Sequence, residues 1–305
     1  MIGVVRLMIT QEGPVAMVHI GLHKTGTTAF QEALDLASPL LARHQIRVMQ
    51  YRGNLYPDTP RSQAFDLANA VIRLDIDAYF RLREPQALLS SVLLESERSV
   101  REYAGCPEPL LIASMESLSL VSCTAEVERL VELLSPREVH IIIVLRDRSE
   151  FLTSMRKQIQ RLGLRRTMKF PDSCLYLEDD TWIADFDRLK GLFTDVLGLD
   201  RVHIIDYDQA VKHYGSVVPE LWSVARLPTL AGREDILEQP WTNLTPIDHL
   251  EVEYPNIDDI TDAAELKALA VSVIQEIKQI KSSRSWKLIQ LLRKFAVLNR
   301  IIRKG

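Results

Sequence analysis

Runs of consecutive hydrophobic residues at several places in the chain predict buried β-strands. The strongest run, residues 139–145, is β-branched and almost entirely apolar, which is typical of a strand near the centre of a parallel sheet. Residues 15–20, 110–114 and 201–206 have the same character, and residues 47–50 allow a shorter strand. These runs have the length of ordinary strands and lack the long polar interruptions of loops.

Between these runs, apolar residues recur at helical spacing. We expect helices at residues 26–36, 62–74, 85–103, 124–134, 150–161 and 181–196, shorter helical pieces from 207 to about 225, and two closing helices at 258–280 and 283–303. Thr124 is expected to cap the helix that follows it. Strands that alternate with helices predict an α/β fold, with a mostly parallel central sheet flanked by helices and ligands bound at the carboxyl ends of the strands.

The length of 305 residues allows one large α/β domain or two small ones. We predict a single domain over residues 1–305. Its core spans about residues 15–227, an irregular segment covers residues 228–257, and C-terminal helices cover residues 258–305.

Composition narrows the class of protein. The chain is 47% hydrophobic and 26% charged, which is an ordinary balance for a globular protein. Its net charge of −4 gives no general reason to expect a nucleic-acid partner, so any anion site must be local. Its three cysteines are widely spaced and have no histidine at metal-ligand spacing, which indicates a reducing compartment and no metal site. No apolar run is long enough to span a bilayer and residues 1–17 do not resemble a signal peptide, so we predict a cytoplasmic protein.

The segment that follows the first predicted strand has the features of an anion site. A short loop leads from Gly21 to a helix that opens near Gly26, and the first N–H groups of a helix lack partners and carry the positive end of its dipole. Thr25, Thr27 and Thr28 add hydroxyl donors. The loop is not a Walker A motif, because that motif places Lys directly after its second Gly, whereas Thr27 follows Gly26 here.

The five residues Lys24, Thr25, Gly26, Thr27 and Thr28, placed after a strand, resemble the 5′-phosphosulfate loop of the sulfotransferases. Enzymes of that family have a P-loop-like α/β fold and use 3′-phosphoadenosine 5′-phosphosulfate (PAPS), which leaves as adenosine 3′,5′-bisphosphate. The resemblance implies that these five residues hold the phosphosulfate group.

A second segment resembles the same family. Arg146 stands at the end of the strongest predicted strand, and Ser154 follows eight residues later in a predicted helix. This step of strand, Arg and Ser is similar to the sulfotransferase segment that holds the 3′-phosphate of the cofactor. A guanidinium supplies a planar fork for phosphate oxygens and a hydroxyl adds a further hydrogen bond.

The chain departs from the cytosolic sulfotransferases that act on small phenols and steroids. Those enzymes usually carry Pro where His23 stands and Trp where Ala29 stands, and their late nucleotide clamp has no clear counterpart here. The motif is closer in form to bacterial sulfotransferase-like proteins, some of which are associated with surface polysaccharides. The acceptor implied by this resemblance is a hydroxyl, or as second choice an amine, of a carbohydrate, glycan precursor or other small molecule.

Sulfuryl transfer depends mainly on positioning and charge stabilisation, as phosphoryl transfer does. The resemblance assigns Lys24 to the charge that grows on the leaving oxygen, with no metal. The acceptor hydroxyl needs a general base. Glu116, which follows a strand end, and His23, which adjoins Lys24, are the two candidates. His19, His140 and His203 lie within predicted strands and are expected to be satisfied core or sheet residues.

Two other functions stay open from the sequence. One is a P-loop-related nucleotide kinase or hydrolase, for which Asp147 or Asp206 could supply a carboxylate to Mg²⁺. The other is a non-catalytic nucleotide-binding module of the same fold. Residues 282–304 form a basic stretch without acidic residues. Its amphipathic spacing is compatible with a helix that lies on the surface of the inner membrane, docks on a partner, or packs on the protein's own domain.

Overall fold

We describe the protein from a computed structural model, which describes residues 13–22, 25–51, 61–74, 76, 89–161, 173–174, 176–230 and 236. The chain divides into two compact units, Met1–Arg52 with Pro60–Trp241 and Gly53–Thr59 with Thr242–Gly305, and every described residue belongs to the first. The expected single domain over residues 1–305 therefore stays a prediction, and the two predicted closing helices lie outside the described residues.

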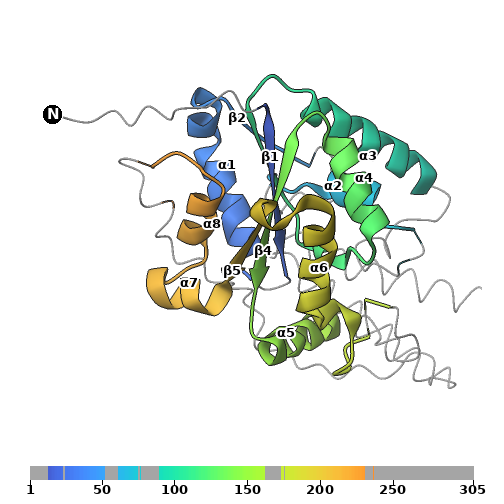
Figure 1. The fold of residues 1–305 in the computed structure, drawn as a ribbon. Coiled ribbons are helices and arrows are strands. Elements are labelled where there is room, and N and C mark those ends of the chain that lie inside the picture. The colour runs from blue at the N-terminus through green and yellow to red at the C-terminus, as the bar shows by residue number, and fades with distance from the viewer. Residues whose placement is uncertain are drawn as a thin grey trace, which may run out of the picture. The chain divides into compact units, whose positions relative to one another are not determined.

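A single parallel sheet forms the centre of the described unit (Figure 1). Its strand order is β2-β3-β1-β4-β5, and all four neighbouring pairs are parallel. The strands are β1 (Val15–Gly21), β2 (Ile46–Val48), β3 (Leu110–Ser114), β4 (Glu138–Leu145) and β5 (Val202–Asp206). The predicted α/β fold with a mostly parallel sheet is confirmed, and each of the five predicted strands is present.

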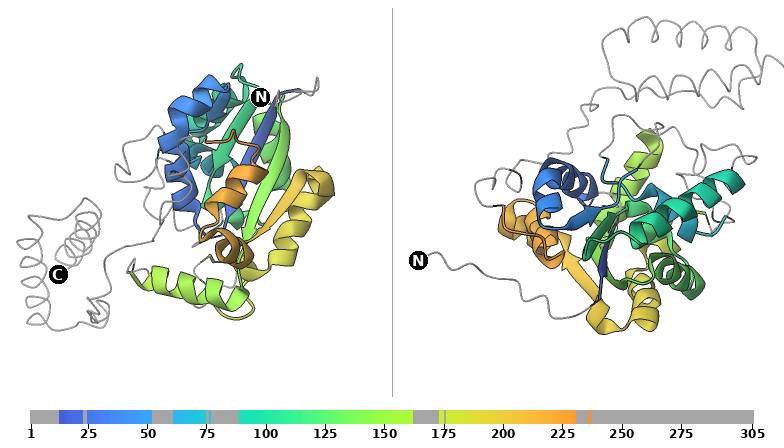
Figure 2. Two further views of the ribbon diagram at one scale, coloured as in Figure 1. Left: turned by 90° about the vertical axis from the view of Figure 1, so that its left-hand side faces the viewer. Right: turned by 90° about the horizontal axis from the view of Figure 1, so that it is seen from above.

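Helices cover both faces of this sheet (Figures 1 and 2). On one face lie α1 (Thr27–Arg43), α7 (Tyr207–Tyr214) and α8 (Val218–Val224); on the other lie α2 (Phe65–Val71), α3 (Leu89–Ala104), α4 (Thr124–Leu134) and α6 (Phe186–Leu197). Helix α5 (Arg148–Arg161) follows β4, and three short 3-10 helices, Glu116–Leu120, Trp182–Ala184 and Leu199–Arg201, complete the described elements.

The alternation of side chains along β1 explains the two cores. Ala16, Val18 and Ile20 pack with the α2–α4–α6 layer, whereas Met17 packs with the α1–α8 layer. Both faces are apolar because helices cover both, which is why the strand reads as a continuous hydrophobic run. His19 shares the face of Met17 and is 1% exposed.

Two predicted helix starts were wrong in detail. The residue that caps α4 is Cys123 rather than Thr124, and the helix begins at Thr124. The helix predicted over residues 181–196 is interrupted at Asp185, whose carboxylate accepts a hydrogen bond from the N–H of Arg188 at 3.0 Å and starts α6. Because the Asp185 side chain caps α6, the 3-10 turn before it and α6 are two separate helical segments.

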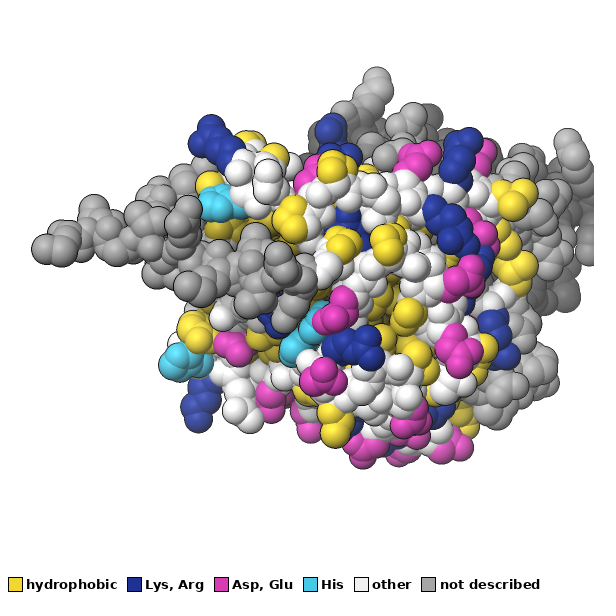
Figure 3. All heavy atoms as spheres, turned by 45° about the horizontal axis from the view of Figure 1, so that its top comes forward, with side chains coloured by type: hydrophobic (Ala, Val, Ile, Leu, Met, Phe, Trp, Pro, Cys, Tyr) yellow, Lys and Arg dark blue, Asp and Glu magenta, His cyan; other side chains and the backbone are white. Residues whose placement is uncertain are grey.

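Acidic and basic side chains are interspersed over the face of the molecule in Figure 3, so no patch of one sign dominates that face. Within the part of the chain that the structure describes, no helix is both long enough and apolar enough to cross a bilayer.

Candidate anion-binding site

The site lies where the strand order changes direction. From β1 the chain moves to β3 and β2 on one side and later to β4 and β5 on the other, so the carboxyl ends of β1 and β4 flank a topological switch point. Gly21 at the end of β1 pairs with Val144 in β4. The loop after Gly21 and the residue Arg146 therefore leave the same edge of the sheet from adjacent strands.

The amino end of α1 has no side-chain cap. Gly26 is the residue that caps the helix, in a left-handed conformation with φ 79°, so it offers no side-chain cap, and the first turn contains no acidic residue. By contrast, α6 and α7 are capped by aspartate side chains. The first N–H groups of α1 and the positive end of its dipole are thus left for an external acceptor.

The three threonines of the loop have different surroundings. Thr25 is fully buried, and both its hydroxyl, at 2.5 Å, and its N–H, at 3.3 Å, donate to the carbonyl of Leu22, so they close the turn. Thr27 is 3% exposed and its hydroxyl has no hydrogen-bond partner. Thr28 is exposed. Lys24 and His23 lie outside the described residues, so their roles stay predictions.

Arg146 lies at the carboxyl end of β4, as predicted, but it is engaged in an ion pair. Its Nε donates to Oε2 of Glu150 at 3.0 Å, and its Nη2 contacts the same oxygen. Its guanidinium also lies over the ring of Tyr207, 5.2 Å from the centroid. An anion that binds Arg146 must therefore compete with Glu150, whose side chain is 54% exposed and can swing into solvent.

Tyr207 connects the two halves of the site. It begins α7 directly after β5, and its ring carries the Arg146 guanidinium. A Cβ added to Gly26 would lie 3.9 Å from Cε2 of Tyr207 and 2.5 Å from Cγ1 of Val217. The loop of β1, the end of β4 and the start of α7 therefore meet around this ring, which no feature of the sequence had marked.

Ser154 lies in α5, partly buried. Arg146, Glu150 and Ser154 follow one another at steps of four residues, and Glu150 and Ser154 therefore share one face of the helix. The prediction that Ser154 assists Arg146 stays a prediction.

Glu116 follows β3 at the same edge of the sheet and begins the 3-10 helix Glu116–Leu120. The backbone ladder continues past the strand, because the N–H of Met115 donates to the carbonyl of His19 at 3.1 Å. Glu116 is partly buried, and its charge acts on the His19 imidazole. The candidate base is thus placed beside β1, while its role stays a prediction.

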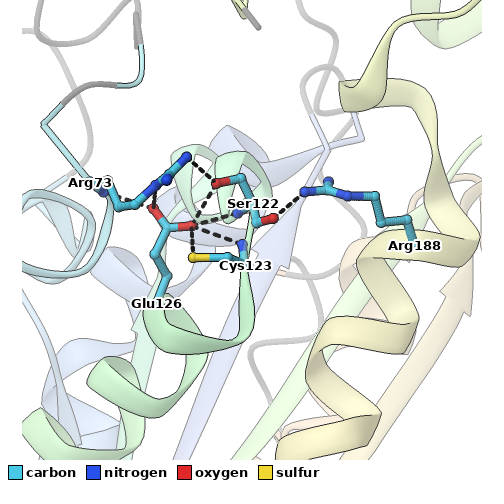
Figure 4. A network of polar contacts seen from close by, with 5 residues as sticks. All are labelled: Arg73, Ser122, Cys123, Glu126 and Arg188. Carbon is cyan, nitrogen blue, oxygen red and sulfur yellow. Dashed lines mark hydrogen bonds and ion pairs between the residues drawn. The ribbon is translucent and has the colours of Figure 1, made fainter.

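A buried carboxylate fixes the far end of the segment that carries Glu116 (Figure 4). Glu126 is 2% exposed and accepts hydrogen bonds from the N–H groups of Ser122 (2.6 Å), Cys123 (3.2 Å) and Arg73 (2.7 Å). Arg188 of α6 donates to the carbonyl of Ser122. The path from β3 to α4 is therefore tied to the segment that follows α2 and to α6.

A buried polar cluster beneath the loop was not foreseen. His19 Nδ1 lies 2.9 Å from the Ser114 hydroxyl, and Gln31 of α1 donates to the carbonyl (3.1 Å) and hydroxyl (3.3 Å) of Ser114. Gln63 donates to the Gln31 side-chain carbonyl at 3.2 Å. The signal in the sequence was a polar residue at an inward position of three otherwise apolar elements.

His19 was expected to be a satisfied core residue, but Nε2 of its ring is buried without a partner. Desolvation by burial lowers the pKa of His19 from 6.5 to about 3, and the nearby charge of Glu116 opposes this only in part. His19 is therefore a neutral imidazole at physiological pH and a weak base. The other two strand histidines contact each other, with His140 Nδ1 3.2 Å from His203 Nε2.

Among the residues that the structure describes, no group of three or more His, Cys, Asp or Glu side chains could hold a metal ion. Asp147 and Asp206, the two alternative Mg²⁺ ligands of the kinase hypothesis, both accept hydrogen bonds at the starts of helices. Asp147 accepts from the N–H groups of Ser149 and Glu150, and Asp206 accepts from Gln209.

No protein-family model matches the chain, and neither does any curated protein. Similar solved structures include a sulfotransferase from Alicyclobacillus acidocaldarius, with TM-score 0.43 and 11% identity over 70% of this chain and 81% of that one. They also include the sulfotransferase domain of the curacin biosynthetic pathway, with TM-score 0.39 and 16% identity over 75% and 78% of the two chains. A third is the sulfotransferase domain of the Synechococcus PCC 7002 olefin synthase, with TM-score 0.39 and 13% identity over 93% and 95%. With TM-scores below 0.5, these similarities assign no function to this chain.

Proposed function

We propose that the protein is a sulfotransferase that moves the sulfuryl group of PAPS to a hydroxyl, or as second choice an amine, of a carbohydrate or glycan precursor. One observation carries the proposal. The two segments that resemble the cofactor-binding segments of sulfotransferases, near residues 24–28 and at Arg146, leave adjacent strand ends at the switch point of one parallel sheet.

The residues present fit a ligand with two anionic groups. The uncapped amino end of α1 and the unpartnered Thr27 hydroxyl supply donors at one end. Arg146 supplies a planar cation at the other, once Glu150 gives way. Tyr207 contributes an aromatic wall between them. A nucleotide phosphorylated at two positions could present one anionic group to each end.

In the reaction, the acceptor oxygen forms a bond to sulfur as the bond from sulfur to the 5′-phosphate oxygen breaks, and the leaving phosphate keeps the electron pair. The amino end of α1 and Lys24 stabilise the charge on that oxygen. Glu116 or His23 takes the proton of the acceptor hydroxyl. Glu116 is the one of the two that the structure describes, and it follows β3 next to β1.

Binding by the purified protein tests this proposal. We expect adenosine 3′,5′-bisphosphate to raise the melting temperature more than ATP or ADP does at equal concentration, because only the bisphosphate engages both anion segments. With PAPS and a panel of glycans, we expect the wild type to transfer sulfate and Lys24→Ala to lose turnover. A melting temperature that responds to ATP and Mg²⁺ but not to the bisphosphate would refute the proposal in favour of a kinase.

Two controls separate the alternatives. A metal chelator should stop a kinase and leave sulfate transfer unchanged. Arg98→Ala removes an exposed arginine on α3, 77% exposed in its side chain, and should leave the response to bisphosphate as in the wild type. Tight binding of the bisphosphate without turnover on any acceptor would indicate a non-catalytic module instead.

The compartment and the partners belong to the same proposal. A cytoplasmic enzyme that sulfates glycan precursors at the inner membrane would have a use for the basic stretch at residues 282–304, which lies outside the described residues. Binding of the protein to anionic and to neutral vesicles, with and without residues 282–304, measures that contact.

A further inference from the structure

Two buried polar atoms without partners approach the same point beneath the anion loop. They are Nε2 of His19 and Oγ1 of Thr27, in residues that are 1% and 3% exposed. A Cβ added to Gly21 would lie 2.0 Å from the Thr27 oxygen and 3.2 Å from the His19 nitrogen. Both atoms therefore border the space that a side chain on Gly21 would fill. A buried polar group without a partner is costly, so a ligand or a rearrangement on binding is expected to satisfy them.

The hydrogen bonds behind His19 determine which ring nitrogen carries the proton. The Gln31 amide must turn its NH₂ group toward Ser114, because the Ser114 carbonyl can only accept. The same NH₂ group reaches the Ser114 hydroxyl oxygen at 3.3 Å. The Ser114 hydrogen is then free to be donated to His19 Nδ1 at 2.9 Å. This pattern of donors and acceptors favours the tautomer with the proton on Nε2.

The opposite tautomer satisfies fewer groups. With the proton on Nδ1, His19 would donate to Ser114, and the Ser114 hydrogen would lose the acceptor that Nδ1 now provides. Nε2 would then be an acceptor, and it would draw the Thr27 hydrogen toward His19 and away from an anion at the amino end of α1. With the proton on Nε2, the one ring group left without a hydrogen-bond partner is the Nε2–H donor, which lies beside Thr27.

We infer that His19 is a positioning residue whose Nε2–H donates toward the Thr27 oxygen when an oxyanion binds, so that the Thr27 hydrogen points at the anion. Every bond in the chain from Gln31 through Ser114 and His19 to Thr27 then donates in the same direction, and such chains strengthen each member. The anion is a tetrahedral phosphate or sulfate group at the amino end of α1. That this group belongs to PAPS rests on the proposed function. That it is an anion rests on the uncapped amino end of α1 and the unpartnered Thr27 hydroxyl.

The electrostatic environment agrees with a donor rather than a base. The His19 ring stacks edge-on against Phe30, with centroids 5.2 Å apart, in a fully desolvated place. The charged group that acts on it there is Glu116, which favours protonation, yet burial still keeps the ring neutral. A neutral imidazole costs no charge burial and can hold its N–H in a fixed direction.

A double-mutant cycle on binding tests this inference. The probes are adenosine 3′,5′-bisphosphate and inorganic sulfate, titrated by calorimetry into the full chain. We expect Thr27→Val and His19→Phe each to weaken binding about tenfold, the effect of one hydrogen bond to a charged group. The double variant should bind no more weakly than Thr27→Val, because His19 acts only through the Thr27 hydroxyl. His19→Gln, which can place an N–H near the position of Nε2, should recover part of the loss.

Effects of the two substitutions that simply multiply would overturn the inference, and so would wild-type affinity in His19→Phe. The matched control is His140→Phe, another buried strand histidine (6% exposed), which should bind like the wild type. If His19→Phe does not fold, Ser114→Ala replaces it, with the same expected coupling to Thr27→Val. Sulfate binding that shows the coupling, with no binding of the bisphosphate, would refute the proposed function and support this inference. Absence of binding to both probes would refute both.

Discussion

Acidification should destabilise this protein through a single buried imidazole. Burial lowers the pKa of His19 to about 3 in the folded chain, from 6.5. Below about pH 6.5 the unfolded chain therefore binds a proton at this position that the folded chain does not. The contribution of His19 to stability is complete above that pH and declines as the pH falls toward 3.

The magnitude follows from the size of the shift. Each pH unit between the unfolded and folded values costs about 1.4 kcal/mol. At about pH 5, one and a half units below the unfolded value, the wild type should have lost about 2 kcal/mol of unfolding free energy through His19 alone. Other groups titrate in the same range, including His203, whose pKa is also lowered by burial. The quantity to measure is therefore a difference between variants.

Urea unfolding at about pH 7.5 and about pH 5 supplies that difference. His19→Gln cannot take up the proton, so it should lose about 2 kcal/mol less than the wild type between the two pH values. His44→Gln, which removes an exposed histidine at the end of α1, controls for the loss of an imidazole and should not show this difference. Equal losses in the wild type and His19→Gln would refute the reasoning.

Four further substitutions, and one that relieves a clash, test the site and its supports. Arg146→Ala should weaken binding of adenosine 3′,5′-bisphosphate about tenfold by calorimetry, and Glu150→Gln should strengthen it by freeing the guanidinium; weakening by Glu150→Gln would contradict the competition seen in the structure. Glu126→Ala should lower the unfolding free energy by about 3 kcal/mol in urea, because three backbone N–H groups lose their shared buried acceptor; a change within about 0.5 kcal/mol would count against the network in Figure 4. Gly26→Ala should cost about 1–2 kcal/mol for its left-handed backbone, plus a clash with Val217 that Val217→Ala relieves; a neutral Gly26→Ala would contradict the conformation assigned to the loop.

The hydrophobic pattern was sufficient for the sheet. Strands 15–21, 110–114 and 138–145 are buried on both faces, so their composition alone marks them. The helix start near Gly26 was also predictable, and α1 begins one residue later, at Thr27. Local hydrogen bonding was less predictable. At Asp185 one capping side chain outweighed the helical spacing around it.

The contacts across the site could not be read from the sequence. His19, Ser114 and Gln31 each look like an isolated polar residue in an apolar element, and only the fold brings them together. Tyr207 likewise reaches the loop from the far end of the chain's described part, after β5. The four-residue spacing of Arg146 and Glu150 could have predicted their ion pair. Whether the Arg146 guanidinium binds Glu150 or a ligand anion depends on the ligand.

The central position of β1 has a consequence for synthesis on the ribosome. Both of its neighbours, β3 and β4, are translated long after it, and β2 reaches the sheet only through β3. The nascent chain must therefore carry an unpaired hydrophobic strand until residue 110 has emerged, and long-range parallel pairing is slow. We expect chains truncated before that residue to depend on chaperones and to aggregate without them.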